Sequence, residues 1–141
     1  MSLTDRFLEK WQQSKDSRYP VIFIVPSQKD VLSDTLLQEF ADLIGGALAD
    51  FAKRYQGVLE TFLTRKQVQE EINSIAKNTP IVMINLEPFY SKWSVDERLA
   101  FIRYMLRSEP SQGIVMVLYC QEDLSAIKAI PDNSRGIIWT I

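Results

Sequence analysis

The sequence predicts an α/β domain built on a five-stranded, mostly parallel sheet with helices on both faces. Short apolar runs alternate along the chain with segments in which apolar residues recur at helical spacing. The best strand candidates are apolar at almost every position, which is typical of parallel strands buried on both faces. Right-handed crossovers and the position of the longest apolar runs predict the strand order 2-1-3-4-5.

The length and composition indicate one domain. The chain has 141 residues, of which 46% are hydrophobic and 24% charged, and no repeat or linker divides it. We expect an amphipathic helix within residues 1–18 and the sheet domain in residues 19–141. The expected segments of the N-terminal half are a helix through Leu3, Phe7 and Trp11, a strand at Val21–Val25, a helix from Asp30 or Ser33 to Ile44, a helix at Ala47–Tyr55 and a weaker strand at Val58–Thr64.

The C-terminal half continues the alternation. Asn78-Thr79-Pro80 ends a helix, and Ser94 three residues before Glu97 has the spacing of a capping box. The expected segments are a helix at Arg65–Asn78, a strand at Ile81–Leu86, a helix after Ser94, a strand at Gly113–Cys120, a short helix at Asp123–Ile130 and a last strand at Gly136–Ile141.

The composition excludes several kinds of chemistry. A single cysteine, Cys120, rules out an internal disulfide framework and zinc sites with paired thiolates, and the absence of histidine rules out imidazole catalysis and ligation. We expect no metal site, since Glu122 and Asp123 have no third carboxylate near them in sequence. The net charge of -2 gives no general attraction to nucleic acid.

The chain shows no sign of membrane targeting. Residues 1–15 are polar and charged, and the longest apolar runs are far below the ~20 residues of a membrane-spanning helix. We therefore expect a cytoplasmic protein that has no membrane partner.

Ligands of open parallel sheets bind at the carboxyl ends of the strands. Three segments should lie at that edge: Pro26–Asp30, Asn85–Glu97 and Tyr119–Asp123. The second is the richest in aromatic and charged residues.

Two of these segments resemble Toll/interleukin-1 receptor (TIR) domains. Phe23–Asp30 is similar to their opening strand and loop, and Phe89–Glu97 is similar to their later box of serine, tryptophan, cysteine and an acidic residue. Pro26 and Ser94 depart from the family pattern, standing in place of an aromatic residue and the cysteine.

The TIR resemblance implies the flavodoxin-like strand order and a role in bacterial defence or immune signalling. It implies cleavage of NAD at the nicotinamide-ribose bond, or self-association with its own kind or another protein partner. NAD would be a substrate, not a cofactor. Glu97 would then be the catalytic carboxylate, with Ser27, Arg65 and Trp93 shaping the pocket.

Each of these residues also has a structural interpretation. Glu97 can accept the backbone N–H of Ser94 in a capping box, and Ser27 can cap a helix. Trp93 can pack in the core, and Arg65 can lie on a solvated surface.

A second resemblance is to small P-loop ATPases. The N-terminal helix, the first strand and the segment Leu36–Phe40 are similar to the start of such a domain, with Ile81–Glu87 in the place of the Walker B strand. Pro26–Thr35 contains no glycine, and Lys29 is not followed by Ser or Thr, so the loop cannot wrap a triphosphate in the usual way. This resemblance implies a catalytically inactive adaptor subunit of a larger complex, of which nucleic-acid-handling complexes are one kind.

Overall fold

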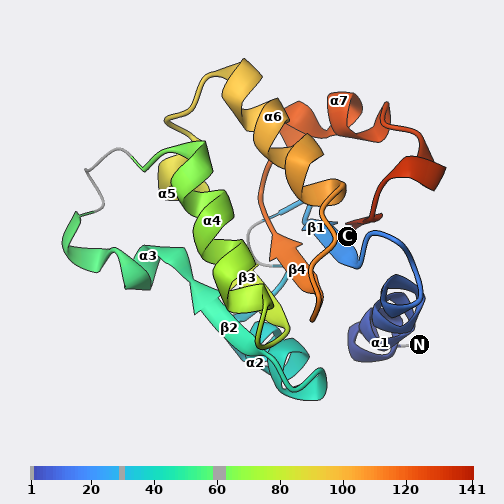
Figure 1. Cartoon of the computed structure of the whole chain (residues 1–141). Helices are drawn as coiled ribbons and strands as arrows, with labels where there is room; N and C mark the ends of the chain where they lie inside the picture. Colours follow the sequence, from blue (N-terminus) through green and yellow to red (C-terminus); the bar gives the residue numbers. More distant parts are fainter. Residues whose placement is uncertain (1, 29–30, 59–62) are drawn as a thin grey trace.

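Five parallel strands form the centre of the domain, in the order β2-β3-β4-β1-β5 (Figure 1). The computed structural model describes residues 2–28, 31–58 and 63–141. The strands are β1 (Val21–Val25), β2 (Ala47–Asp50), β3 (Ile81–Ile84), β4 (Ile114–Val117) and β5 (Ile137–Thr140). The expected α/β class with a parallel sheet is confirmed.

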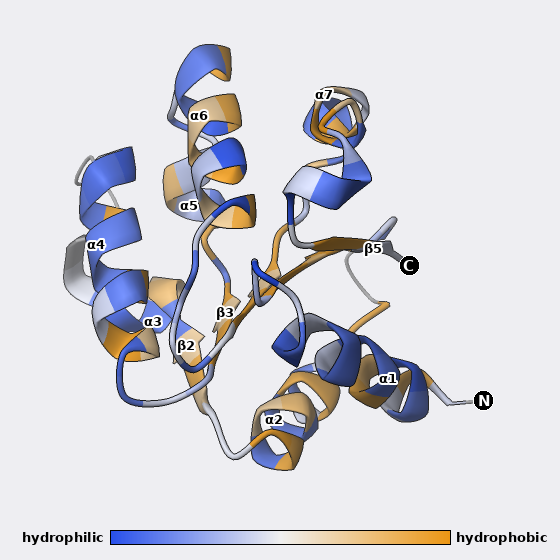
Figure 2. Ribbon diagram, turned by 45° about the vertical axis from the view of Figure 1, so that its right-hand side comes forward, coloured by the Kyte–Doolittle hydropathy of each residue, from blue (hydrophilic) through white to orange (hydrophobic). Residues whose placement is uncertain are grey.

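Helices cover both faces of this sheet. Figure 2 shows α1 and α2 on one side, and α4, α6 and α7 on the other. The helices are α1 (Leu3–Lys15), α2 (Asp34–Leu43), α3 (Phe51–Arg54), α4 (Arg65–Ala76), α5 (Glu87–Tyr90), α6 (Val95–Leu106) and α7 (Leu124–Lys128), with 3-10 turns η1 (Gln56–Val58), η2 (Gln121–Asp123) and η3 (Asp132–Ser134). Of the described residues, none belongs to a helix long and apolar enough to span a membrane.

The strand order corrects the expected 2-1-3-4-5. In the structure β4 lies between β3 and β1, so that Ile114 aligns with both Ile81 and Val21. β1 consequently has β4 and β5 as neighbours, and β2 and β5 form the edges. Hydrophobic periodicity identifies strands, but it does not encode which of several similar apolar strands pair with each other.

The second strand lies earlier in the chain than expected. Residues Ala47–Asp50, expected to be helical, form β2 and pair with β3. The Ala47 N–H donates to the Pro80 carbonyl oxygen (2.8 Å), and a Cβ atom on Gly46 would lie 2.6 Å from that oxygen. Pairing with β3 overrides the helix propensity of this alanine-rich segment.

The strand expected at Val58–Thr64 is not borne out where it can be checked. Val58 belongs to η1, and residues 59–62 lie outside the described residues. Thr64 instead caps α4 in a capping box with Gln67.

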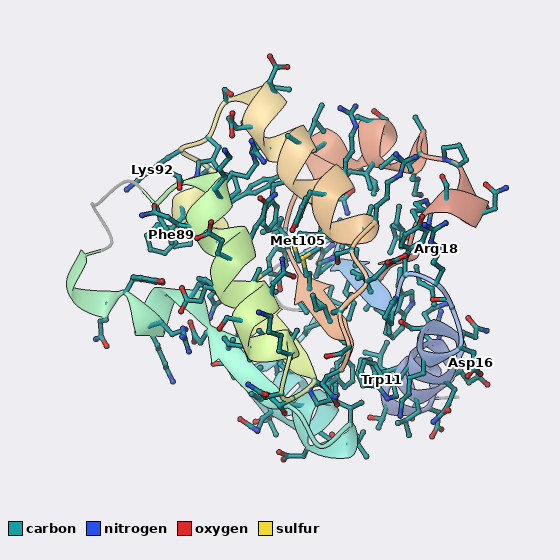
Figure 3. The ribbon with its side chains drawn as sticks, in the orientation of Figure 1. Trp11, Asp16, Arg18, Phe89, Lys92 and Met105 are labelled. Atoms are coloured by element: carbon teal, nitrogen blue, oxygen red, sulfur yellow. The ribbon has the colours of Figure 1, made fainter. Side chains whose placement is uncertain are left out.

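Helix α1 packs against the sheet, as its apolar stripe predicts. Phe7 is fully buried and stacks on Phe40 of α2, with ring centroids 4.1 Å apart. Trp11 is 4% exposed and lies so close to Gly113 that a Cβ there would approach the indole to 2.7 Å. Figure 3 shows Trp11 on α1 and Met105 on the opposite layer, where Met105 of α6 is fully buried.

Candidate functional site

The carboxyl edge of the sheet contains a hollow of about 380 Å³. It lies among the end of β3, the end of β4, the start of α2, and α3, which is the place where parallel sheets bind ligands. The residues that line it are Leu32, Asp34, Leu37, Ala52, Ile84, Asn85, Glu87, Pro88, Val117 and Tyr119.

Asn85 shapes the floor of this hollow. Its φ of 58° is in the left-handed region, which asparagine tolerates better than most residues. The Asn85 side-chain amide donates to Asp50 Oδ2 (3.0 Å), and Asp50 Oδ1 accepts the backbone N–H of Lys53 to cap α3. This contact ties the edge strand β2 to β3 at the point where both end.

The charge of the hollow is acidic. Its charged lining residues are Asp34 and Glu87, and the described lining contains no lysine or arginine. The remaining walls are mostly apolar. Such a lining does not attract phosphate groups, since the described lining residues supply no cation. Lys29 and Asp30, in the preceding loop, lie outside the described residues.

Glu97 lies in the first turn of α6, outside the hollow. Its backbone N–H donates to Ser94 Oγ (3.2 Å), which is one half of the expected capping box. The carboxylate pairs with Arg65 at the start of α4, with Arg65 Nε 2.7 Å from Glu97 Oε2. About half of the Glu97 side chain is exposed, so this residue serves as a surface link between α4 and α6.

The other two expected pocket residues, Trp93 and Ser27, differ in burial and in hydrogen-bond partners. Trp93 is 3% exposed, packs on Tyr90 and Phe101, and donates its indole N–H to the Leu63 carbonyl oxygen (2.7 Å). Ser27 is exposed after β1, and its backbone N–H donates to the Ile141 carbonyl oxygen (2.8 Å). The structure therefore brings Arg65 to Glu97, buries the Trp93 ring, and shows no contact of Ser27 with any of the three among the described residues.

A buried polar network lies beside this region and was not expected from the sequence. Asp123 is 5% exposed and accepts from the Tyr90 hydroxyl (2.5 Å) and from Arg98 Nε (2.9 Å) and Nη2 (3.3 Å). Arg98 also donates to the Trp93 carbonyl oxygen (3.0 Å). The network joins α5, α6 and η2. Its one signal in the sequence is an acidic residue after β4, Asp123, which can pair with a basic residue on the preceding helix, Arg98.

The ionisation of these groups follows from their surroundings. Burial opposes ionisation of Asp123, but hydrogen bonds from Arg98 and Tyr90 outweigh it and lower the pKa of the carboxyl group. Burial, followed by the hydrogen bond to Asp123, raises the pKa of Tyr90. Burial, and then the nearby Asp123, raises the pKa of the Cys120 thiol to about 12. Cys120 is therefore a buried, protonated thiol.

Comparison with family models, with curated proteins and with solved structures finds no match to this chain. Within the part of the chain that the structure describes, no group of three or more acidic or cysteine side chains is suited to hold a metal ion.

Proposed function

We propose that this chain is a catalytically inactive, P-loop-like subunit that acts as an adaptor in a larger assembly. The observation that carries the proposal is the acidic hollow at the carboxyl edge. It lies between the segment that follows β1 and the end of β3, the two places that hold the phosphate loop and the Walker B acid in the resemblance described above. Asp34 and Glu87 face a space where a nucleotide would place its phosphates.

The strand order gives no support to the TIR interpretation. That resemblance implies the order 2-1-3-4-5. In this sheet β4 lies between β1 and β3.

Cleavage of NAD by Glu97 receives less support from the geometry. A carboxylate that stabilises a ribosyl cation has to face the bound sugar. Glu97 is paired with Arg65 on the surface, and neither residue is among those that line the hollow.

Two binding measurements test the proposal. We expect titration calorimetry to detect no binding of Mg-ATP, because the loop after β1 has no glycine and the hollow is acidic. We also expect no nicotinamide release from NAD, with Glu97→Gln as the matched variant. A low-micromolar affinity for Mg-ATP contradicts the adaptor, and NAD turnover that Glu97→Gln abolishes supports the TIR interpretation in its place.

The adaptor role also has a positive test. A tagged chain in a native extract should sediment in an assembly much larger than its own 16.3 kDa, and depletion of ATP should not release it. A chain that sediments only as a monomer, with and without ATP, contradicts the proposal.

A further inference from the structure

A second, larger hollow lies at the opposite edge of the sheet. Its volume is about 840 Å³, and it is formed by the C-terminal ends of α4 and α6 and by the loops that lead into β1 and β4. Because all strands are parallel, these segments meet at the amino edge, away from the acidic hollow. We call it the amino-edge groove.

Positive charge is concentrated in the amino-edge groove. Its lining includes Arg18, Lys77, Arg103 and Arg107, against one carboxylate, Glu109. Glu109 pairs with Arg18, with Arg18 Nε 2.8 Å from Glu109 Oε1. The groove thus carries an excess of three positive charges on a chain whose net charge is -2.

The three other cations have no acidic partner among the described residues. The ion pairs found there involve neither Lys77, Arg103 nor Arg107. Arg107 donates to the Ser134 carbonyl oxygen (3.2 Å), a neutral group, and Lys77 and Arg103 are exposed. These charges are available to an anionic ligand.

Compensation of helix dipoles explains only part of this arrangement. Lys77 and Arg107 are the C-cap residues of α4 and α6, and Arg103 is in the last turn of α6, where cations are favourable. That effect does not require Arg18, which lies in a loop, and it does not explain why an aromatic ring is exposed among the cations.

The exposed ring belongs to Tyr104, which is 47% exposed and lines the groove. The Asn73 side-chain amide donates to the Tyr104 hydroxyl (3.1 Å), which holds the ring in position. Tyr19 also lines the groove, with the Arg18 guanidinium 5.1 Å from the centre of its ring.

We propose that the amino-edge groove binds a short stretch of single-stranded nucleic acid. Lys77, Arg103 and Arg107 would contact successive phosphates, and a base would stack on Tyr104. Unpaired cations around an exposed aromatic ring are the combination that single-stranded nucleic acid requires. An acidic peptide would use the cations but would leave the ring without a role. The proposal is independent of the adaptor function, which rests on the opposite edge.

The test uses fluorescence anisotropy with labelled oligonucleotides of twelve deoxythymidines and of twelve uridines. We expect binding that weakens with salt, with a slope of log affinity against log salt of about -2, from about three phosphate contacts. The deoxythymidine and uridine arms show whether the groove distinguishes DNA from RNA.

Matched variants locate the binding. Lys77→Gln with Arg103→Gln should weaken binding roughly tenfold and bring the salt slope closer to zero by more than about 1. The control is Lys66→Gln with Lys53→Gln, which removes the same charge from the exposed N-terminal turn of α4 and from α3. Tyr104→Ala should weaken binding roughly fivefold or more.

One variant should improve binding. Glu109→Gln removes the one acidic side chain of the groove and releases Arg18, so affinity should rise roughly twofold to fivefold and the salt slope should steepen. A variant that has merely lost its fold cannot produce this gain.

Three results would overturn the proposal. The first is no oligonucleotide binding at low salt. The second is binding that the Lys77 and Arg103 double variant and its Lys66 and Lys53 control weaken equally. The third is tighter binding of a polyglutamate peptide than of either oligonucleotide, which would assign the groove to an acidic protein partner.

Discussion

At the scale of single residues, Asp123 is the side chain on which the buried polar contacts depend. Its carboxylate accepts hydrogen bonds from the Tyr90 hydroxyl and from Nε and Nη2 of Arg98. Asp123→Asn leaves the partly buried Arg98 guanidinium without a counter-charge, and we expect a loss of about 2 kcal/mol in the free energy of unfolding, measured with urea. The control is Glu109→Gln, which breaks a fully exposed pair and should leave the free energy of unfolding almost unchanged.

The same carboxyl group should contribute to acid sensitivity. Its pKa in the folded state lies below that of the unfolded chain, about 3.9 for an aspartate. Its stabilising contribution is therefore complete above about pH 4 and is lost as the pH falls through the folded-state pKa. Between about pH 4 and pH 2, Asp123→Asn should lose less stability than the wild type. Equal slopes for both proteins would mean that the Asp123 pKa is the same in the folded and the unfolded chain.

Substitution of three glycines distinguishes two causes of destabilisation, a positive φ and a steric clash with a neighbouring side chain. Gly113 has a φ of +92° and lies against Trp11, Gly45 has a φ of +65° with open space around it, and Gly57 has neither constraint. Alanine should therefore cost about 1 kcal/mol at Gly45, more at Gly113, and almost nothing at Gly57. Thermal denaturation of the three variants measures this ranking, and an equal cost at Gly45 and Gly113 would show that the Trp11 contact contributes nothing.

At the scale of elements, the sequence predicts the strands that are rich in β-branched and aromatic residues and mistakes β2 for a helix. β1 is buried at every position and was predicted with its bounds, and Ser94 correctly marks the start of α6. β2 consists of alanine, leucine and aspartate, which lack the β-branched and aromatic side chains of a strand, so its sequence resembles a helix. β5 is also an edge strand buried at one position, but its Ile-Ile-Trp run predicts a strand correctly.

Helix α1 should be essential to stability. Deletion of residues 1–17 uncovers the face of the sheet that Phe7 and Trp11 cover. We expect the melting temperature to fall by several degrees or more, because a loss of a few kcal/mol has that effect in a domain of this size. An unchanged melting temperature would mean that α1 docks without stabilising the sheet.

At the scale of the whole molecule, Cys120 is a reporter of global opening. It is fully buried, its pKa is raised to about 12, and the chain has no second cysteine. Reaction with a thiol reagent at pH 8 should be slow in the native protein and should accelerate with urea in parallel with unfolding. Rapid labelling without urea would show instead that η2 opens locally.

The position of the hollow at the carboxyl edge could be predicted from the sequence, but most of the residues that line it could not. The alternation of elements correctly places a hollow at the carboxyl edge, and the segment Asn85–Glu97 does contribute to it through Asn85, Glu87 and Pro88. Glu97 lies in the same segment, yet it is in the first turn of α6 and pairs with Arg65 of α4. The direction of a side chain depends on such short turns and on contacts distant in sequence, so the motif alone could not assign its role.

The position of β1 in the sheet has a consequence for synthesis. β1 is translated early, but its two neighbours, β4 and β5, begin at Ile114 and Ile137. A nascent chain must therefore hold five consecutive apolar residues, Val21–Val25, without a partner strand until β4 has left the ribosome. Until then this segment is exposed to aggregation, and α1, which precedes it, has only an incomplete sheet to cover. The protection of β1 thus depends on strands that are made only after β2 and β3.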